Sequence, residues 1–376
     1  MGTTLEARMI ATGGRSSGFD YLRVILATAV VFWHAFTIIH ERTFNDSVLA
    51  TPWRGLVMFI LPMFFALSGF LVAGSLFRNS ISGFVGLRVI RIYPALAVEV
   101  LLSAFILGPL LTSFPLSHYF GAKIFSRYLL NMLGWIHYSL PGVFLTNPTP
   151  NVVNGQLWTV PWELWCYLSL TVLALLRITK SRVLFLAVTV AATVVVYGIQ
   201  LYLHHGQWDH TGGMAGETLP LSFLYAVAVY LYRDKLPWNG WLFVASLVVM
   251  GLVFEVVPAG DYLAGPAAAY ATIYLGLLNP KKIWILRGAD YSYGLYIYHF
   301  AIQQALIFLL PGGRQWYIIF LLSFVLTAAF AAFSWHLVEK PALGARKWLL
   351  PWLDDRLARA GAIFSGALKP ASRPSS

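Results

Sequence analysis

Long apolar runs recur along this chain, and short polar segments separate them. Ten of these runs approach the length of a membrane-spanning helix, which needs about 20 mostly apolar residues. By residue number they cover 22–39, 55–76, 93–112, 157–176, 183–203, 218–232, 241–257, 261–279, 292–311 and 316–337. The pattern therefore predicts an all-α polytopic membrane bundle of about ten transmembrane helices.

An eleventh apolar stretch, 128–145, is broken by polar and helix-breaking residues, namely Asn131, His137, Ser139, Pro141 and Gly142. The basic residues decide whether it crosses, because Lys and Arg gather in cytoplasmic loops. If it does not cross, the basic segments fall on one side, and the other side keeps only Arg42, Arg54, Lys123, Arg127 and Arg314. We therefore expect a re-entrant or surface-lying segment, with both chain termini in the cytoplasm.

Composition places the chain among membrane proteins independently of the pattern. Of its 376 residues, 59% are hydrophobic and 11% are charged, and the mean hydropathy is +0.70, whereas a soluble domain carries about a quarter charged residues. The first twenty residues are polar and lack the apolar core of a cleaved signal peptide, so we expect the N-terminus to be retained. The net charge of +11 follows from the basic cytoplasmic segments, so a nucleic-acid partner is not expected.

We divide the chain into a cytoplasmic N-terminal segment (1–19), one transmembrane domain (20–345) and a cytoplasmic tail (346–376). The tail contains a modestly amphipathic stretch, WLLPWLDDRLARAGAIF, and ends in KPASRPSS, whose composition predicts disorder. Cys166 is the single cysteine, so no internal disulfide is expected. No His/Cys cluster has the spacing of a metal site, so no metal is expected either.

His34 is an ionisable residue deep inside the first apolar run, where burial in lipid is costly, and such residues are functional candidates. Arg23 stands eleven residues earlier, which places the imidazole roughly 16 Å further into the bilayer. Glu163 and His34 both lie roughly 8 to 9 Å below the outer surface by the same measure. A carboxylate bonded to one imidazole nitrogen makes the other a general base. The alternative is structural, with an interhelical hydrogen bond from His34 and a Glu163 that faces an outer vestibule.

Arg88 and Arg91 stand three positions apart in GLRVIRIYPAL, which puts them on one face of a helix. Two guanidinium groups at the inner edge of the membrane suit a phosphate-bearing ligand, because each presents a planar fork of donors. Ordinary positive-inside anchoring is the alternative interpretation. Pro94 follows closely and predicts that the next helix begins near residue 93.

The strings around these residues are specific as an ensemble. FDYLRVILATAVVFWH contains Arg23 and His34 separated by ten residues, while RVIR holds the arginine pair and NGQLWTVPWELWCYL holds Glu163. MFFALSGFL, YSYGLYIYHF and VEKPAL extend the set over nearly the whole chain. Together they resemble the acyltransferase-3 family of membrane O-acyltransferases, which modify bacterial surface polysaccharides, lipopolysaccharide and some antibiotics. Pro161 departs from the pattern, since the family more often has a small or aliphatic residue there.

The resemblance implies an acyl donor, usually acetyl-coenzyme A, that approaches from the cytoplasm, and a hydroxyl acceptor on a surface or exported glycan. It implies that Arg88 and Arg91, assisted by Arg23, hold donor phosphates, and that no cofactor is permanently bound. His34 would deprotonate the acceptor hydroxyl or relay the acyl group, with Glu163 orienting its ring. Other residues in or near these strings are candidates for the lining of the cavity, namely Ser68, Tyr93, Trp158, Asp290, Tyr296 and His299.

Two other functions stay open at this point. A proton-coupled transporter or flippase of a glycan precursor would use His34, Glu163, Glu99 and His299 as a proton relay. A glycan-binding membrane scaffold would need no chemistry. We expect the bacterial inner membrane as the location and its lipids as neighbours, while the acceptor sugar, the acyl chain length and the oligomeric state are not predicted.

Overall fold

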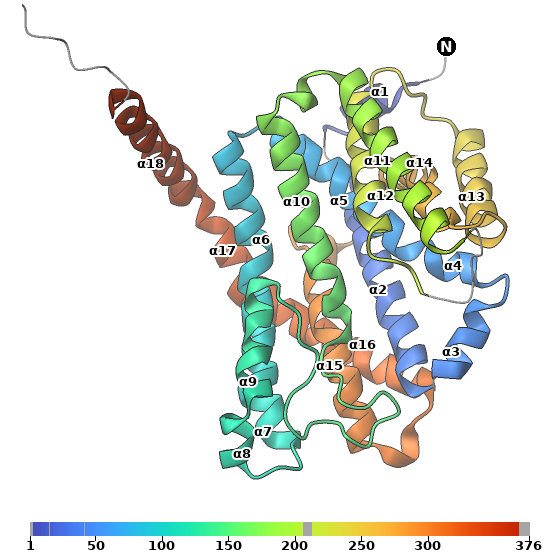
Figure 1. The fold of residues 1–376 in the computed structure, drawn as a ribbon, viewed down its shortest axis with the longest axis vertical. Coiled ribbons are helices and arrows are strands. Elements are labelled where there is room, and N and C mark those ends of the chain that lie inside the picture. The colour runs from blue at the N-terminus through green and yellow to red at the C-terminus, as the bar shows by residue number, and fades with distance from the viewer. Residues whose placement is uncertain (1–2, 15, 41, 206–212, 368–376) are drawn as a thin grey trace, which may run out of the picture.

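Helices make up the regular structure of the chain, and the longest of them run side by side through one bundle (Figure 1). The computed structural model describes residues 3–14, 16–40, 42–205 and 213–367, and no strand lies within these ranges. Each predicted span is occupied by helix, namely α2 (Gly18–Ile39), α4 (Arg54–Met58) with α5 (Ile60–Leu76), α6 (Ile81–Leu102) with α7 (Gly108–Leu111), α10 (Val160–Leu175), α11 (Arg182–Leu203), α12 (Thr218–Leu231), α13 (Gly240–Glu255), α14 (Gly265–Gly276), α15 (Ser292–Leu309) and α16 (Trp316–Ser334).

Five continuous helices of the described chain are long and apolar enough to cross a membrane, namely Ser17–Ile39, Arg54–Leu76, Ile81–Leu111, Arg182–Leu203 and Trp316–Arg356. The all-α membrane fold is therefore confirmed, while the count of ten spans stays a prediction. The remaining α-helices are α1 (Leu5–Ala11), α3 (Arg42–Leu49), α8 (Leu116–Gly121), α9 (Lys123–Tyr128), α17 (Lys340–Gly344) and α18 (Arg346–Ala367). The N-terminal segment and the far end of α18 lie toward the same end of the bundle (Figure 1). The predicted disorder of the last residues falls at 368–376, outside the described chain.

The prediction that the third helix starts near residue 93 is wrong, because α6 begins at Ile81. Ser80 caps it, its hydroxyl accepting the Gly83 N–H at 3.0 Å. Arg88 and Arg91 lower the hydropathy of this stretch, but arginine is a good helix former and the helix continues through them. Pro94 consequently lies inside α6 rather than in its first turn. Both arginines therefore project from the body of a helix and not from a loop.

The interrupted stretch 128–145 forms no spanning helix. The 3₁₀ turn η2 (Leu129–Leu133) follows α9 and ends at Gly134, whose φ of 81° is the left-handed conformation that glycine tolerates. The Asn131 side chain then donates to the His137 carbonyl at 2.8 Å and accepts the His137 N–H at 2.7 Å, which closes a turn. The chain runs on irregularly to η3 (Gly155–Thr159), and its depth in the bilayer stays a prediction.

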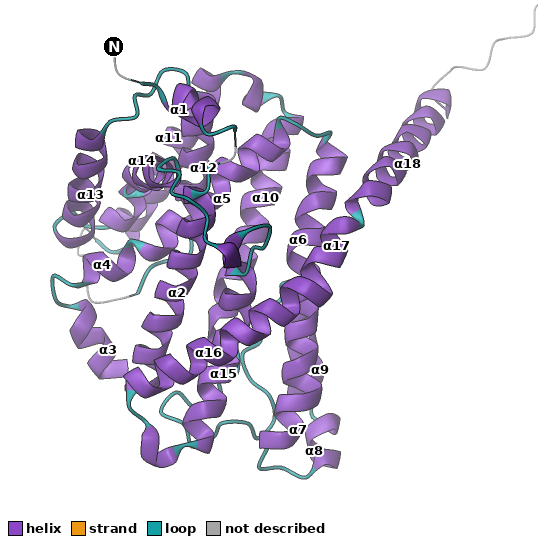
Figure 2. Cartoon of the chain, turned by 180° about the vertical axis from the view of Figure 1, so that it is seen from behind, coloured by secondary structure: helices purple, strands orange, loops and turns teal. Residues whose placement is uncertain are grey.

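A glycine allows α5 and α12 to cross at close range. A Cβ atom on Gly69 of α5 would lie 2.3 Å from the carbonyl oxygen of Phe223 in α12, so the two backbones meet where only glycine fits. Such contacts drive helix association in membranes, where apolar burial gives no advantage over lipid. The helices α5, α12 and α14 form the centre of the bundle, and α15 and α16 pack on the face seen in Figure 2.

A buried ion pair fastens α4 to the turn η5 (Gly260–Leu263). The guanidinium of Arg54 donates to both carboxylate oxygens of Asp261, at 3.2 and 2.8 Å, and to the Phe254 carbonyl at 2.8 Å. The side chains are 2% and 3% exposed. Arg54, assigned above to an outer loop, is therefore a buried structural residue.

Substituting Asp261→Ala should lower the free energy of unfolding by about 3 kcal/mol, because it leaves the Arg54 charge buried without its partner. Thermal unfolding of the purified protein in detergent measures this loss. The matched control is Asp234→Ala, whose partner Arg182 lies 3.0 Å away in a pair that is 42% and 39% exposed, and its effect should stay below about 1 kcal/mol. Equal losses in the two variants would contradict the prediction.

Candidate functional site

Three cavities follow one another through the bundle. The basic cavity, about 910 Å³, lies between α2, α5, α6 and α18. The central cavity, about 120 Å³, lies between α5, α6, α10 and α15. The histidine cavity, about 370 Å³, includes His34. Arg23, Arg88 and Arg91 line both the basic and the central cavity, while Leu61 and Tyr296 line both the central and the histidine cavity. The cavities are therefore adjacent and lead from the arginines toward His34.

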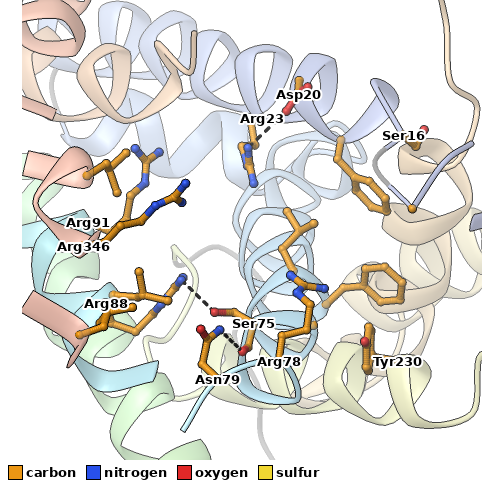
Figure 3. A pocket seen from close by; sticks show the side chains of 18 of the residues that line it. Ser16, Asp20, Arg23, Ser75, Arg78, Asn79, Arg88, Arg91, Tyr230 and Arg346 are labelled. Carbon is orange, nitrogen blue, oxygen red and sulfur yellow. Dashed lines mark hydrogen bonds and ion pairs between the residues drawn. The ribbon is translucent and has the colours of Figure 1, made fainter. Parts of the chain in front are cut away.

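The basic cavity has a strongly positive lining. Its cationic side chains come from the three helices α2, α6 and α18 and from the turn after α5, and Asp20 is the carboxylate among its lining residues. Figure 3 shows Arg23 of α2 facing Arg88 and Arg91 of α6 across this space, with Arg78 at the end of α5. An anion entering the cavity would meet guanidinium groups on several sides, which is the arrangement that proteins use for phosphate.

Arg91 is held by two carboxylates. Its guanidinium donates to Asp290 at 2.8 Å and to Glu339 at 3.0 Å. Asp290 also accepts from Arg23 at 3.2 Å, so it joins α2 to α6 just before α15 begins. Burial alone would raise the pKa of Asp290, but Arg91 and Arg23 hold the pKa of this carboxyl well below its usual value. These ion pairs therefore stabilise the folded protein at a pH above the pKa that the Asp290 carboxyl has in the unfolded chain. Their contribution is lost as the pH falls through the lower pKa that Asp290 has in the folded protein.

Arg88 differs from Arg91 although the sequence makes them look equivalent. In the described chain it forms no ion pair, and its guanidinium contacts the Ser75 hydroxyl at 3.5 Å. Its Nε atom is buried without a hydrogen-bond partner. The group also stands 5.7 Å from the Tyr167 ring centre. Arg88 therefore has donors free for a ligand, whereas Arg91 is committed to the protein.

Glu163 faces the central cavity and not the His34 ring. Its carboxylate accepts a hydrogen bond from Tyr167, whose hydroxyl lies 3.5 Å from that of Ser68. Pro161 falls in the first turn of α10, where its missing N–H has no helical partner to lose, so the departure noted above leaves Glu163 in place. The prediction that Glu163 orients the His34 imidazole is therefore wrong, because Glu163 is bonded to Tyr167 and His299 is bonded to His34.

His299 takes that position instead. His34 Nδ1 and His299 Nε2 are 2.7 Å apart, and His299 Nδ1 lies 2.8 Å from the Tyr296 carbonyl. A carbonyl only accepts, so His299 carries its proton on Nδ1, and in the neutral ring its Nε2 accepts from His34 Nδ1. The Nε2 atom of His34 then has a lone pair. This chain of hydrogen bonds fixes one tautomer and leaves a base available.

Aromatic side chains line the histidine cavity beside His34. They are Trp33, Tyr138, Trp158 and Tyr296, the last fixed by a hydrogen bond to the Gln156 carbonyl at 3.1 Å. Phe300 packs its edge against the His34 ring, with 5.3 Å between ring centres. Tyr138 comes from the irregular stretch after α9, so that segment helps to form the wall of the cavity.

The structure brings most of the predicted site residues together along the three cavities. Those that line them are Arg23, His34, Ser68, Arg88, Arg91, Trp158, Glu163 and Tyr296. Asp290 and His299 lie behind them, each bonded to a lining residue. Tyr93 packs against the apolar core and lines none of the three, so its assignment is wrong.

Sequence reasoning missed Glu339, Tyr167 and the cations of α18. Glu339 closes a π-helical turn, η8 (Trp335–Glu339), and its 2% exposed side chain reaches Arg91. Glu339 belongs to the VEKPAL segment quoted above, but the residues of that segment do not indicate that an arginine in another helix is the partner of Glu339. An acidic residue at the end of the last apolar run was the available signal.

Comparison with known proteins points to one family. A family model described as an acyltransferase domain, acyltransferase 3, matches residues 16–336. The chain is 28% identical over 370 residues to nodulation protein 10 of Rhizobium leguminosarum bv. viciae, which covers 90% of this chain and 96% of that protein. It is 27% identical over 342 residues to an O-acetyl transferase of Shigella phage Sf6, covering 87% and 96% respectively. No solved structure gives a significant match.

The two arginines of α6 should differ in what they do for stability. Arg91→Gln should lower the free energy of unfolding by about 2 to 3 kcal/mol, because Glu339 and Asp290 lose their cation. Arg88→Gln should change it by less than about 0.5 kcal/mol, since no ion pair is broken. Thermal unfolding without donor measures both. A loss at Arg88 as large as that at Arg91 would contradict the assignment of free donors to Arg88.

Proposed function

We propose that this protein, which belongs to the acyltransferase-3 family and is an O-acyltransferase, moves an acetyl group from cytoplasmic acetyl-coenzyme A to a hydroxyl of a surface or exported glycan. The observation that carries the proposal is the series of adjacent cavities. Free guanidinium donors lie at one end and an imidazole lone pair lies at the other. Coenzyme A enters and leaves as a substrate, and no permanently bound cofactor is required.

The length of the donor fits the depth of His34. About thirteen bonds separate the phosphorus of coenzyme A from its thioester sulfur, and an extended chain advances roughly 3.5 Å per three bonds, so the arm spans about 15 Å. Along α2, Arg23 and His34 are separated by roughly 16 Å at the helical rise. A diphosphate at Arg88 and Arg23 would therefore bring its thioester through the central cavity to the imidazole.

We propose that the basic cavity opens on the cytoplasmic side, because segments near both chain ends line it. Met9 and Ser16 of the N-terminal segment line the basic cavity together with Arg346 of α18. The positive-inside rule assigns these segments to the cytoplasm, where acetyl-coenzyme A is found. The histidine cavity would then open toward the opposite face, and its aromatic walls suit the ring of a sugar. We propose the bacterial inner membrane as the location.

The transfer step needs one base. In direct transfer, His34 Nε2 takes the proton of the acceptor hydroxyl, the oxygen attacks the thioester carbonyl, and the C–S bond breaks. The imidazolium then returns the proton to the sulfur, so coenzyme A leaves as a thiol. In the second route His34 Nε2 attacks the carbonyl itself, the C–S bond breaks, and coenzyme A departs as a thiolate from the acyl-histidine. The acceptor oxygen then attacks the acyl carbon, the N–C bond breaks, and the hydroxyl proton ends on the thiolate sulfur. His299 is a positioning residue in both routes because it fixes the tautomer.

Incubating membranes with acetyl-coenzyme A labelled in the acetyl group tests the proposal directly. We expect label on purified glycan with the unaltered protein, and loss of at least about a hundredfold in rate with His34→Ala, because the base is removed. Equal expression and equal thermal unfolding of the variant exclude a folding defect. Glycan that moves across the membrane without gaining label would contradict acyl transfer and favour a flippase.

The role of His299 predicts a graded response. His299→Phe cannot accept from His34 Nδ1, so kcat should fall about a hundredfold or more while the KM for the donor stays unchanged. His299→Gln offers a carbonyl oxygen in place of the ring nitrogen and should retain more of the rate. A loss shared equally between kcat and KM, or no difference between the two variants, would contradict a role in fixing the tautomer.

A further inference from the structure

Helices α17 and α18 form one wall of the basic cavity. Leu343, Arg346, Lys347 and Leu350 line it from this side. Figure 3 shows Arg346 among the side chains around this space, and Arg91 of α6 lines the same cavity. The C-terminal region therefore belongs to the site, although the sequence pattern predicted only a tail beyond the membrane domain.

The start of α18 is fixed on the start of α6. Asp354 accepts hydrogen bonds from the Ser80 hydroxyl at 2.9 Å and from the Ser82 hydroxyl. Gly86 gives the leucines room, since a Cβ atom there would stand 2.9 Å from Leu353 and 3.4 Å from Leu350. Because α6 also carries Arg88, these contacts set the position of the α18 cations relative to it.

Besides Arg88, three cations of this cavity have no carboxylate partner among the described residues. Arg78, Arg346 and Lys347 form no ion pair within the described chain. Asp20, the carboxylate of the lining, is already bonded to Lys282 and lies 3.5 Å from Arg23. Like charges gathered around one space repel one another, and an anion between them removes the repulsion.

The order of the cations along the cavities matches the order of charges along the donor. Arg88 lines both the basic and the central cavity, whereas Arg78, Arg346 and Lys347 line the basic cavity alone and are exposed at its rim. They are therefore further from the central cavity, and so from His34, than Arg88 is. In coenzyme A the diphosphate follows the pantetheine arm, and the 3′-phosphate on the ribose comes last.

We propose that Arg346 and Lys347, together with Arg78, bind the 3′-phosphate of the donor, so that the C-terminal helix selects coenzyme A thioesters over thioesters that lack this group. The inference rests on the proposed function and adds a specificity site to it. A phosphate monoester carries about two negative charges at neutral pH and has three acceptor oxygens, which suits several cations at an open rim. The anionic headgroup of a membrane lipid is the competing ligand.

The test compares the binding of coenzyme A with that of 3′-dephospho-coenzyme A to the full-length protein in nanodiscs of neutral lipid. The unaltered protein should bind coenzyme A about tenfold more tightly, which corresponds to the low end for charge-assisted contacts. In the double variant Arg346→Gln with Lys347→Gln, most of this preference should be lost because coenzyme A binds more weakly, while the affinity of the dephospho form stays unchanged. Arg78→Gln should lower the same ratio from the α5 side.

Two controls separate this site from its surroundings. Arg356→Gln removes a cation of the same helix that lies over the Trp352 ring and lines none of the three cavities, and it should leave both affinities unchanged. Arg88→Gln should weaken both ligands by the same factor and preserve their ratio, because the diphosphate is common to them.

The outcomes distinguish this inference from the proposed function. If the unaltered protein binds both forms equally, or if the double variant weakens both equally, the 3′-phosphate site is wrong and the donor assignment stands. If neither form binds the unaltered protein, the donor assignment fails as well. An effect of the double variant on binding to vesicles of anionic lipid, with an unchanged ratio of the two nucleotides, would assign the cations to the membrane.

Discussion

The salt-bridge network around Arg91 is the interaction on which the site depends. Arg91 on α6 joins Asp290, just before α15, to Glu339 at the end of the π-helical turn η8, and Asp290 also binds Arg23 on α2. Four segments that are distant in sequence therefore meet where the basic cavity becomes the central one. A charge inside a membrane bundle is stable when it is paired or reaches water. The network satisfies this condition and gives the junction a fixed geometry.

That network explains why two arginines in one short motif take different parts. The i, i+3 spacing gives Arg88 and Arg91 one helix face, but the segments packed on that face are not symmetric. Carboxylates reach Arg91 from the segment just before α15 and from η8, while Arg88 meets Ser75 and the ring of Tyr167. Arg91 therefore holds the helix junction together, while the guanidinium of Arg88 keeps hydrogen-bond donors free for a ligand. In the proposed function this division holds the donor without disturbing the helix junction.

The sequence was sufficient for the class of fold and for most of the residues along the cavities. Apolar runs predict helices reliably, and the depth of a residue on a helix follows from the helical rise, which is why Arg23 and His34 were found. Depth says nothing about the direction in which a side chain points, so Glu163 was paired with the wrong group. The start of α6 was missed because Arg88 and Arg91 lower the local hydropathy. Glu339 and the α18 cations depend on contacts between distant segments, which no local pattern contains.

The partner of His34 affects the chemistry that the site can perform. A carboxylate would fix the same tautomer, but it would also stabilise the protonated ring and so hinder the return of the proton. The His299 ring, itself oriented by the Tyr296 carbonyl, fixes the tautomer without adding a negative charge to the interior. In the proposed cleavage of a thioester, the proton must pass from the acceptor hydroxyl to the departing sulfur in one cycle. The neutral His299 ring therefore suits His34, because His34 must release the proton that it accepts. A neutral partner also adds no charge to the interior that would need its own counter-ion.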